Sequence, residues 1–356
     1  MTITLVIRLS SLGDVAILIP TLYSVASKNP DDIFLLITKK PLQPLFFNKP
    51  DNLIIFPMQS KERHKGFWGL IRAIGDIDAV VNQLRKKDLT GRNSKQILKV
   101  ADLHAVIRSA IIDFFFRLKG AKVAVIAKSR LAGRALVRRE NKIFQPLQTA
   151  FGRYREVFEK LSYDASLNFK GFYPKEDKKT ETWIGVAPFA KHRSKIYPFE
   201  QMEEVVRILN NRPATKIFLF GGKEECRLLE EWTRKYGRVE SVAGSMPFPD
   251  ELSLMNRLDV MLSMDSANMH LASLVNTPVV SVWGATHPYA GFYSYNQNPK
   301  NAVQIDLSCR PCSIFGGKPC WRGDYACLTG IDPQVIVEKI NSLLSLPQIT
   351  SETPQS

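Results

Sequence analysis

The sequence predicts an α/β protein of two domains, each with a parallel sheet covered by helices on both faces. Short apolar runs alternate with segments of helical spacing along all 356 residues, and such alternation is typical of parallel sheets. The hydrophobic content of 45% is enough for two cores, because domains of about 100 to 200 residues are usual. A polar stretch rich in helix-breaking residues at 168–179 suits a linker.

The first half contains five predicted strands, each a short run of apolar and β-branched residues. They span residues 2–9, 33–38, 53–56, 97–102 and 121–126. Apolar residues recur at helical spacing in 21–28, 67–87 and 105–119. Residues 1–170 are therefore expected to form the first domain.

The second half repeats this logic. Its predicted strands span residues 183–187, 216–220, 239–242, 260–263 and 278–282, with helices between them, for example at 200–210 and 224–236. Residues 171–346 are expected to form the second domain. The polar tail at 347–356 is expected to be disordered.

The positive charge of the chain is concentrated in its first half. The formal net charge is +15, and residues 1–170 contain 29 Lys and Arg against 14 Asp and Glu, whereas residues 171–356 contain 20 of each. This asymmetry favours an anionic partner for the first half, either nucleic acid, an anionic bilayer surface or a phosphorylated substrate. A basic surface that merely aids solubility would spread over both halves.

The chain is expected to be cytoplasmic, and either soluble or peripheral on a membrane. Its start lacks the basic segment of a signal peptide. The longest apolar stretches, 15–26 and 110–118, are interrupted by Pro20 and Asp113 and are shorter than the roughly 20 residues that a spanning helix needs.

Polar residues follow two of the predicted strands. Ser10, Ser11, Gly13 and Asp14 come after the first strand, and residues 265–270 come after the strand at 260–263. Ligands bind outside the carboxyl ends of strands in open parallel sheets. Two such edges in separate halves predict a site built between two domains.

Asp14 has two competing interpretations. A dinucleotide-binding turn would carry three glycines, but this turn has Gly13 followed by an acidic residue, so a nicotinamide or flavin cofactor is not expected here. Asp14 can cap the following helix. It can also act as a base that accepts a proton from a substrate hydroxyl.

The two motifs resemble those of glycosyltransferase family 9, the lipopolysaccharide heptosyltransferase family. Residues 8–15, Arg-Leu-Ser-Ser-Leu-Gly-Asp-Val, resemble its opening signature. In residues 264–284 an aspartate, a hydroxyl residue and a histidine precede a proline-led strand that ends in glycine, as in the family. The resemblance extends over most of the chain in strand order and implies a GT-B type fold of two facing Rossmann-like domains, acceptor-binding first and donor-binding second.

The resemblance also implies the chemistry. The family transfers a sugar from a nucleotide donor, ADP-heptose being the best-known one, to the lipopolysaccharide inner core. By this similarity Asp14 deprotonates the acceptor hydroxyl, which displaces the nucleotide with inversion at the anomeric carbon. No metal or other cofactor is expected, so protein groups must stabilise the diphosphate leaving group.

The second half offers groups that can stabilise a diphosphate. Ser266 and Ala267 open a predicted helix whose first N–H groups suit a phosphate. His270 lies one turn further on and is either a phosphate ligand or a packed histidine. Asp265 is expected to cap this helix or to bind a donor hydroxyl. Lys195 stands where the family carries a diphosphate-binding lysine, although Ala190 and Lys191 replace residues that often bear hydroxyls.

Glu225 follows the glycine pair at 221–222, and the resemblance implies that this residue, or its neighbour Glu224 as a near alternative, contacts the nucleoside or sugar hydroxyls of the donor. A plain helix start rich in acidic residues explains it equally well. On the acceptor side, His104 and Arg108 lie one helical turn apart after a predicted strand, and the arginine suits a carboxylate or phosphate. Ser10, Ser11 and Gly13 complete the expected acceptor group.

Four of the five cysteines lie close together in the sequence, at Cys309, Cys312, Cys320 and Cys327. The first pair has the spacing of metal ligands, which makes zinc a minority option. The remaining spacings match no common zinc ribbon, so a local structural element is favoured, and disulfides are disfavoured in a reducing compartment.

Two further functions remain open. The net charge alone would suit a nucleic-acid-binding protein, but no helix-turn-helix or RNA-binding signature accompanies it, so nucleic acid is not expected as a partner. A relative that binds sugar nucleotides without catalysis would keep the donor residues and be indifferent to Asp14. The expected partners are a nucleotide-sugar donor, an anionic lipid A and core acceptor, and the inner face of the cytoplasmic membrane.

Overall fold

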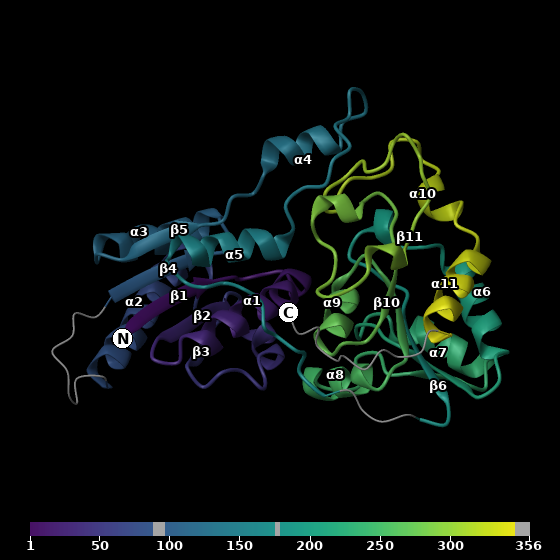
Figure 1. Ribbon diagram of the computed structural model, residues 1–356, viewed down its shortest axis with the longest axis horizontal. Helices are drawn as coiled ribbons and strands as arrows, with labels where there is room; N and C mark the ends of the chain where they lie inside the picture. The colour runs from purple at the N-terminus through teal and green to yellow at the C-terminus, as the bar shows by residue number, and fades with distance from the viewer. Residues whose placement is uncertain (88–96, 175–178, 346–356) are drawn as a thin grey trace, which may run out of the picture. The chain divides into compact units, whose positions relative to one another are not determined.

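We describe the protein from a computed structural model, which describes residues 1–87, 97–174 and 179–345. The chain divides into two compact units (Figure 1). Unit 1 comprises Met1–Leu131 and Leu147–Phe172, and unit 2 comprises Ala132–Pro146 and Tyr173–Ser356. The tail at 347–356, predicted to be disordered, lies outside the described residues, as does part of the linker predicted at 168–179.

Unit 1 contains a parallel sheet in the order β3-β2-β1-β4-β5. The strands are β1 (Thr2–Ile7), β2 (Ile33–Lys39), β3 (Leu53–Met58), β4 (Ile97–Asp102) and β5 (Lys122–Val125). The helices are α1 (Leu12–Lys28), the 3-10 helix η1 (Lys40–Leu45), α2 (Gly66–Lys87), α3 (Ile107–Leu118), α4 (Arg130–Leu136) and α5 (Ala150–Lys160). Strands and helices therefore alternate as the sequence predicts.

The helices cover both faces of this sheet. On one face, α2 and α3 share a core with the strands, in which Ile77 and Phe116 are fully buried. On the other face, α1 packs against α5. In Figure 1 these elements run from purple (α1) through blue (α2 and α3) to teal (α5). Because all five strands run parallel, the residues that follow β1, β3 and β4 gather at the same edge of the sheet.

The first helix is longer than predicted. The sequence suggested a helix at 21–28, with Pro20 as an interruption, whereas α1 begins at Leu12 and contains Pro20 in its interior. Twelve consecutive residues around it, from Val15 to Ala26, are buried. Tertiary packing therefore outweighs the local cost of one missing backbone hydrogen bond.

Unit 2 contains a parallel sheet in the order β11-β10-β9-β6-β7-β8. The strands are β6 (Thr182–Ala187), β7 (Thr215–Leu219), β8 (Val239–Ser241), β9 (Val260–Met264), β10 (Val279–Val282) and β11 (Ala302–Val303). The α-helices are α6 (Phe199–Asn210), α7 (Cys226–Lys235), α8 (Phe248–Asn256), α9 (Ala267–Leu274), α10 (Ala326–Thr329) and α11 (Pro333–Leu344). Three short 3-10 helices are η2 (Arg193–Lys195), η3 (Pro288–Ala290) and η4 (Pro299–Asn301).

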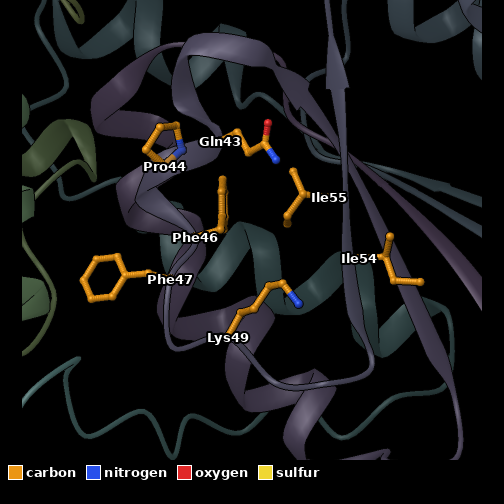
Figure 2. Close-up of a pocket in the computed structure, with 7 residues that line it drawn as sticks. All are labelled: Gln43, Pro44, Phe46, Phe47, Lys49, Ile54 and Ile55. Carbon is orange, nitrogen blue, oxygen red and sulfur yellow. The ribbon is translucent and has the colours of Figure 1, made fainter. Parts of the chain in front are cut away.

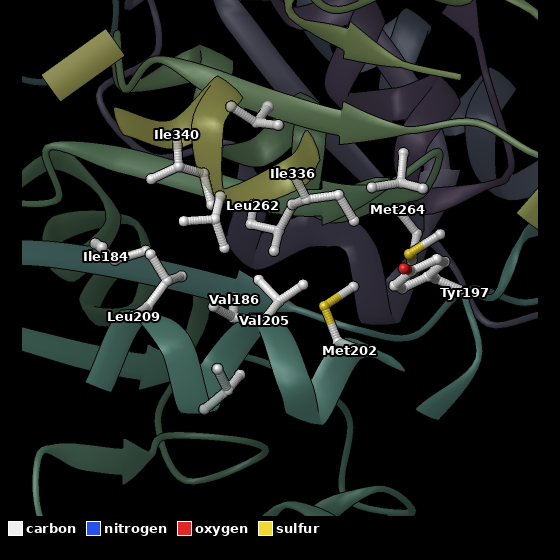
Figure 3. Packing of buried hydrophobic residues seen from close by; sticks show 14 of the residues in the cluster. Ile184, Val186, Tyr197, Met202, Val205, Leu209, Leu262, Met264, Ile336 and Ile340 are labelled. Carbon is white, nitrogen blue, oxygen red and sulfur yellow. The ribbon is translucent and has the colours of Figure 1, made fainter. Parts of the chain in front are cut away.

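The core of unit 2 lies between its sheet and the helices α6, α7 and α11. Figure 3 shows Ile184, Val186 and Leu262 of the strands packed against residues of α6 and α11. All three strand residues are fully buried. On the other face of the sheet, α9 contacts β9, β10 and α8. This packing fixes the carboxyl ends of β6, β7 and β9 side by side.

One segment of the first half belongs to unit 2. The sequence places all of 1–170 in one domain, whereas Ala132–Pro146 groups with the second unit. The Lys142 ammonium group donates to the carbonyl oxygens of Ser308, Arg310 and Pro311, at 3.0, 2.7 and 3.2 Å. The Phe144 ring packs against His287 at 5.0 Å between centroids. Contacts so distant in sequence leave no local pattern that would reveal them.

No helix in the described part of the chain combines the length and the apolar character needed to cross a membrane.

Candidate functional site

Asp14 lies in the first turn of α1, and one of its oxygens holds three contacts. Its Oδ2 atom lies 2.6 Å from the guanidinium of Arg8. The same oxygen accepts hydrogen bonds from the backbone N–H of Ser11 at 3.1 Å and from the Ser11 hydroxyl at 2.8 Å. The other oxygen, Oδ1, makes no hydrogen bond or ion pair within the described residues. One carboxylate oxygen is thus anchored and the other can accept a proton.

Arg8 holds the Asp14 carboxylate in place. Its guanidinium also donates to the carbonyl oxygen of Leu103 at 2.6 Å and lies over the ring of Tyr154, 5.8 Å from the centroid. The Tyr154 hydroxyl in turn donates to the carbonyl oxygen of Asp14 at 3.3 Å. These contacts join β1, β4, α1 and α5. The orientation of Asp14 therefore depends on the fold of the whole of unit 1.

The electrostatic balance keeps Asp14 ionised. Burial raises its pKa, but the charge of Arg8 and the hydrogen bonds from Ser11 lower it further, so the net pKa is below the usual value. At neutral pH the group is a carboxylate. The Ser11 contact is that of a helix cap, so capping and proton acceptance engage different oxygens of the same side chain.

His104 contacts the same loop. Its Nδ1 atom accepts a hydrogen bond from the backbone N–H of Leu9 at 3.0 Å. Burial, together with the charge of Arg8, lowers its pKa to about 4. The ring is therefore neutral at physiological pH and carries its proton on Nε2.

The other residues expected on the acceptor side lie near this edge of the sheet. Ser10 and Ser11 belong to the loop between β1 and α1, and Gly13 lies in the first turn of α1. Arg108 lies in the first turn of α3, is half-buried, and forms no ion pair within the described ranges. The structure links His104 to the loop of Asp14 but shows no hydrogen bond from Arg108 to either.

A buried pair of carboxyl groups, Asp102 and Asp113, lies near this edge and was not predicted from the sequence. Asp102, fully buried at the end of β4, accepts hydrogen bonds from the backbone N–H groups of His104 and Ala105 and from the Ser109 hydroxyl. Burial and the nearby charge of Asp102 raise the pKa of Asp113. Two acidic residues on different elements give no local signal, since their proximity depends on α3 packing against β4.

In unit 2, Lys195 and Asp265 form an ion pair. The Lys195 ammonium group lies 2.8 Å from Oδ2 of Asp265, with 15% and 8% of the two side chains exposed. The Thr286 hydroxyl donates to the same oxygen at 2.6 Å. The aliphatic part of Lys195 packs against Gly316, where a Cβ atom would lie 2.4 Å from the lysine Cδ. Lys195 therefore has a defined position.

The start of α9 differs from one prediction. Ser266, not Asp265, occupies the cap position before Ala267. Asp265 instead turns to Lys195 and Thr286, because a buried carboxylate is best stabilised by a cation and a hydroxyl. The Ser266 hydroxyl lies 3.2 Å from that of Ser263.

His270 is a buried histidine in α9. Its Nδ1 atom lies 3.3 Å from the Ser294 hydroxyl, and that hydroxyl also donates to the carbonyl oxygen of Met269 at 3.0 Å. These contacts hold its ring in place, and both interpretations that the sequence allowed remain predictions.

Glu225 lies just before α7, at the carboxyl end of β7. Its Oε2 atom accepts a hydrogen bond from the backbone N–H of Gly222. This contact closes a local turn at the helix start, while Oε1 has no hydrogen bond in the described residues. Because β9, β6 and β7 are neighbours in the sheet, Asp265, Lys195 and Glu225 all follow the carboxyl ends of adjacent strands.

The four clustered cysteines line one small cavity. Cys309, Cys312, Cys320 and Cys327 all border it, together with Arg310, and all four are free thiols. Burial raises the pKa of Cys327 to about 11. In the described part of the chain no group of three His, Cys, Asp or Glu side chains is placed to hold a metal ion. The structural element that the sequence favoured over zinc stays a prediction.

Arg310 anchors this cysteine segment and was not singled out in the sequence. Its guanidinium donates to the carbonyl oxygens of Gly284, Trp283 and Thr286, at 2.6, 3.2 and 3.0 Å. It thereby binds the backbone around Thr286, whose side chain holds Asp265. A buried arginine in a loop looks like a surface charge in sequence, because only the fold shows the carbonyl groups around it.

A separate pocket lies in unit 1, and none of the carboxyl-edge residues named above lines it. Figure 2 shows its lining by η1 and β3, with Phe46, Phe47, Ile54 and Ile55 beside Lys49. The walls are mainly apolar. No titratable pair faces it among the lining residues, so it offers a binding surface without catalytic groups.

Comparisons with known proteins agree with this description. The model of glycosyltransferase family 9 (heptosyltransferase) matches residues 95–314. A lipooligosaccharide heptosyltransferase 2 of Campylobacter jejuni is 26% identical over 140 residues, which are 38% of this chain but only 43% of that protein. A lipopolysaccharide heptosyltransferase 1 of Campylobacter coli is 23% identical over 365 residues, covering 95% of this chain and 98% of that protein.

Two solved structures share the fold. A glycosyl transferase family 9 protein of Veillonella parvula has a TM-score of 0.70 at 18% identity, covering 96% of this chain and 97% of that one. A heptosyltransferase of E. coli, solved with ADP, has a TM-score of 0.63 at 18% identity, covering 96% of this chain and all of that one. At these identities the likeness concerns the arrangement of the two sheets and their helices.

Proposed function

Since the chain belongs to glycosyltransferase family 9, we propose that it transfers heptose from ADP-heptose to the inner core of lipopolysaccharide, with Asp14 as the general base. The GT-B architecture of two Rossmann-like parallel sheets suits this activity. The observation that carries the proposal is the Asp14 carboxylate, which is ionised and has one oxygen available.

The proposed step is a single displacement. Oδ1 of Asp14 takes the proton of an acceptor hydroxyl, and the resulting oxygen nucleophile forms a bond to the anomeric carbon. The bond from that carbon to the diphosphate oxygen breaks on the opposite face, so the configuration inverts. Because Oδ2 stays paired with Arg8, the carboxylate keeps its orientation while Oδ1 becomes protonated.

The leaving diphosphate carries the charge that must be stabilised. We assign this to Lys195, to the first N–H groups of α9 after Ser266 and Ala267, and to His270. Asp265 would then release the Lys195 ammonium to the phosphate and keep its bond to Thr286. Glu225 is assigned to the hydroxyls of the donor through its second oxygen. No other cofactor enters this scheme.

The donor assignment is supported by the relatives. One similar E. coli heptosyltransferase was solved with ADP and another structure with ADP-2-deoxy-2-fluoro heptose. On the acceptor side, the positive charge of the first half suits the phosphates of lipid A and its core. His104 and Arg108 are the residues assigned to it. We place the reaction at the inner face of the cytoplasmic membrane.

The decisive experiment replaces Asp14 by Asn and measures ADP release with ADP-heptose and a core acceptor. The amide cannot accept the proton, so we expect kcat to fall by about 100- to 10,000-fold, with donor affinity kept. The control is Asp31→Asn, an exposed carboxyl of the same unit. Wild-type kcat in Asp14→Asn would exclude Asp14 as the base, whereas donor binding without ADP release by wild type would identify a protein that only binds sugar nucleotides.

The donor is tested separately by thermal shift against a panel of nucleotide sugars. A ligand that binds the folded protein raises its Tm according to its saturation. ADP-heptose should give the largest increase. An increase with guanosine or uridine compounds alone would overturn the ADP-heptose assignment, and salt-sensitive RNA binding that Lys195→Ala does not alter would favour nucleic acid.

A further inference from the structure

The outer face of α3 is apolar, although it points to solvent. Ile107, Ile111, Phe114 and Leu118 recur at the spacing of one helix face. Ile107 is 83% exposed and Leu118 is 73% exposed. The opposite face of the same helix carries Ile112 and Phe116, which are buried in the core. Ile111 is partly buried and packs against this core, whereas Ile107, Phe114 and Leu118 remain exposed.

The first turn of α2 exposes a second set of apolar side chains. Phe67, Trp68 and Ile71 are all exposed, and the Trp68 side chain is 78% accessible. The two helices pack side by side, and the Asp78 carboxylate of α2 pairs with Lys119 after α3 at 2.5 Å. Asp78 and Lys119 each lie twelve residues beyond the start of their helix, so the helices are in register.

The exposed apolar residues of the two helices therefore form one surface, which we name the α2–α3 patch. It consists of Phe67, Trp68, Ile71, Ile107, Phe114 and Leu118. An apolar patch of this kind on a folded surface is a mark of an interaction site.

Positive charge surrounds the α2–α3 patch. Residues 61–87 and 104–122 contain eleven Lys and Arg against four Asp and Glu. Lys65, Arg72 and Arg117 are exposed. Of the acidic residues, Asp76 is paired with Arg63 and Asp113 is buried. The surroundings thus attract an anionic surface.

We propose that the α2–α3 patch docks unit 1 on a bilayer that contains anionic lipids. A helix lying in the interface with apolar and aromatic residues inward and Lys and Arg at its rim is the usual form of peripheral membrane binding. Trp and Phe favour the headgroup boundary, and basic residues gain from anionic lipid.

The position of the patch fits the acceptor, and this step rests on the proposed function. The first turns of α2 and α3 follow β3 and β4, and the Asp14 turn follows β1, all at the carboxyl edge of one parallel sheet. The end of the patch that contains Phe67, Trp68 and Ile107 therefore lies at the edge that carries the base, where a lipid-anchored acceptor would be held. Phe114 and Leu118 lie further along α3.

The test is co-sedimentation of the full chain with vesicles of phosphatidylcholine alone or with phosphatidylglycerol. We expect wild type to bind the phosphatidylglycerol vesicles, with binding that weakens as salt rises. The triple variant Trp68→Ser, Phe114→Ser, Leu118→Ser should bind at least tenfold more weakly. Its side chains are exposed, so its Tm should stay near that of wild type.

Matched controls change exposed residues elsewhere. Leu228→Ser with Val335→Ser removes exposed apolar side chains from α7 and α11 and should leave vesicle binding unchanged. Lys65→Glu with Arg117→Glu should weaken binding, whereas Arg227→Glu with Lys300→Glu, on exposed residues of unit 2, should have a smaller effect.

Three results would overturn the docking surface. The first is that the wild-type protein does not bind phosphatidylglycerol vesicles. The second is that the triple variant binds them as strongly as wild type. The third is that wild type self-associates in sedimentation without binding vesicles and that the triple variant does not self-associate. Sugar transfer to a delipidated core acceptor separates the two proposals. Transfer without vesicle binding would overturn only the proposed docking surface, and vesicle binding without transfer would overturn only the proposed transferase activity.

Discussion

Single residues decide the chemistry of the candidate site through their charged neighbours. Burial by itself would raise the pKa of Asp14, but the Arg8 guanidinium at 2.6 Å helps to bring that pKa below its usual value. Lys195 is likewise held by Asp265. Asp14 and Lys195 were singled out by their place after strands together with the resemblance to glycosyltransferase family 9. The sequence did not locate their partners, because each pair forms only when the chain folds.

Removing Arg8 should move the acid limb of the pH-rate profile. In Arg8→Gln the burial that raises the pKa of Asp14 is no longer opposed by the guanidinium. The carboxylate is then protonated at a higher pH, so we expect the acid limb of kcat/KM to lie at a higher pH than in wild type. Profiles that extend down to the lowest pH at which both proteins stay folded measure this.

Arg155→Gln serves as the control, since Arg155 pairs with Glu159 and has no contact with Asp14. Its profile should match that of wild type. An unchanged acid limb in Arg8→Gln would mean that Arg8 does not govern the proton acceptor.

Lys195→Ala should weaken donor binding. Losing a charged contact to phosphate costs about 1.5 to 3 kcal/mol, which corresponds to roughly a 10- to 150-fold higher Kd for ADP by titration calorimetry. Lys191→Ala, an exposed lysine of the same loop, should bind ADP like wild type. Equal affinity in both variants would remove Lys195 from the diphosphate site.

At the scale of elements, the loops that follow the strands are held by contacts with distant segments. The cysteine segment contacts η2 through Gly316, whose φ of +78° and close approach to Lys195 exclude a side chain. The strands and most helices followed from apolar periodicity. The α4 and α5 helices did not, since their basic and polar residues dilute the pattern.

Gly316→Ala tests this contact. A Cβ atom there would lie 2.4 Å from the Lys195 Cδ, and the positive φ adds strain, so we expect a loss of about 1 to 3 kcal/mol in unfolding free energy and weaker ADP binding. Gly75→Ala lies in the interior of α2 with open space around it and should stabilise by about 0.5 to 1 kcal/mol. Denaturant unfolding measures both, and an unaffected Gly316→Ala protein would contradict the steric argument.

At the scale of the whole molecule, the chain passes between its two units more than once. The division at a single linker followed from composition, but Ala132–Pro146 belongs with unit 2. Its attachment depends on Lys142, which bonds three carbonyl groups. Burial lowers the pKa of this lysine. Composition does not reveal that residues 132–146 group with unit 2, because this segment is as basic as the sequence on either side of it.

Lys142→Ala should therefore loosen this segment. The carbonyl groups of Ser308, Arg310 and Pro311 lose their donor, and we expect a loss of about 1 to 3 kcal/mol with faster cleavage between residues 132 and 146 by trypsin or chymotrypsin. Lys128→Ala removes a nearby lysine with a single carbonyl contact and should have a smaller effect. Equal cleavage rates would show that other contacts hold the segment.

The ion pair of Lys195 has a consequence for any anion that binds there. Asp265 already neutralises the ammonium group, and its own desolvation is offset by that cation and by Thr286. A phosphate that binds here must therefore displace the Asp265 carboxylate from Lys195. The observed affinity is the difference between the attraction of Lys195 for the phosphate and its attraction for Asp265. Replacing Asp265 would therefore change the affinity for the product nucleotide, although Asp265 itself is not among the groups proposed to contact it.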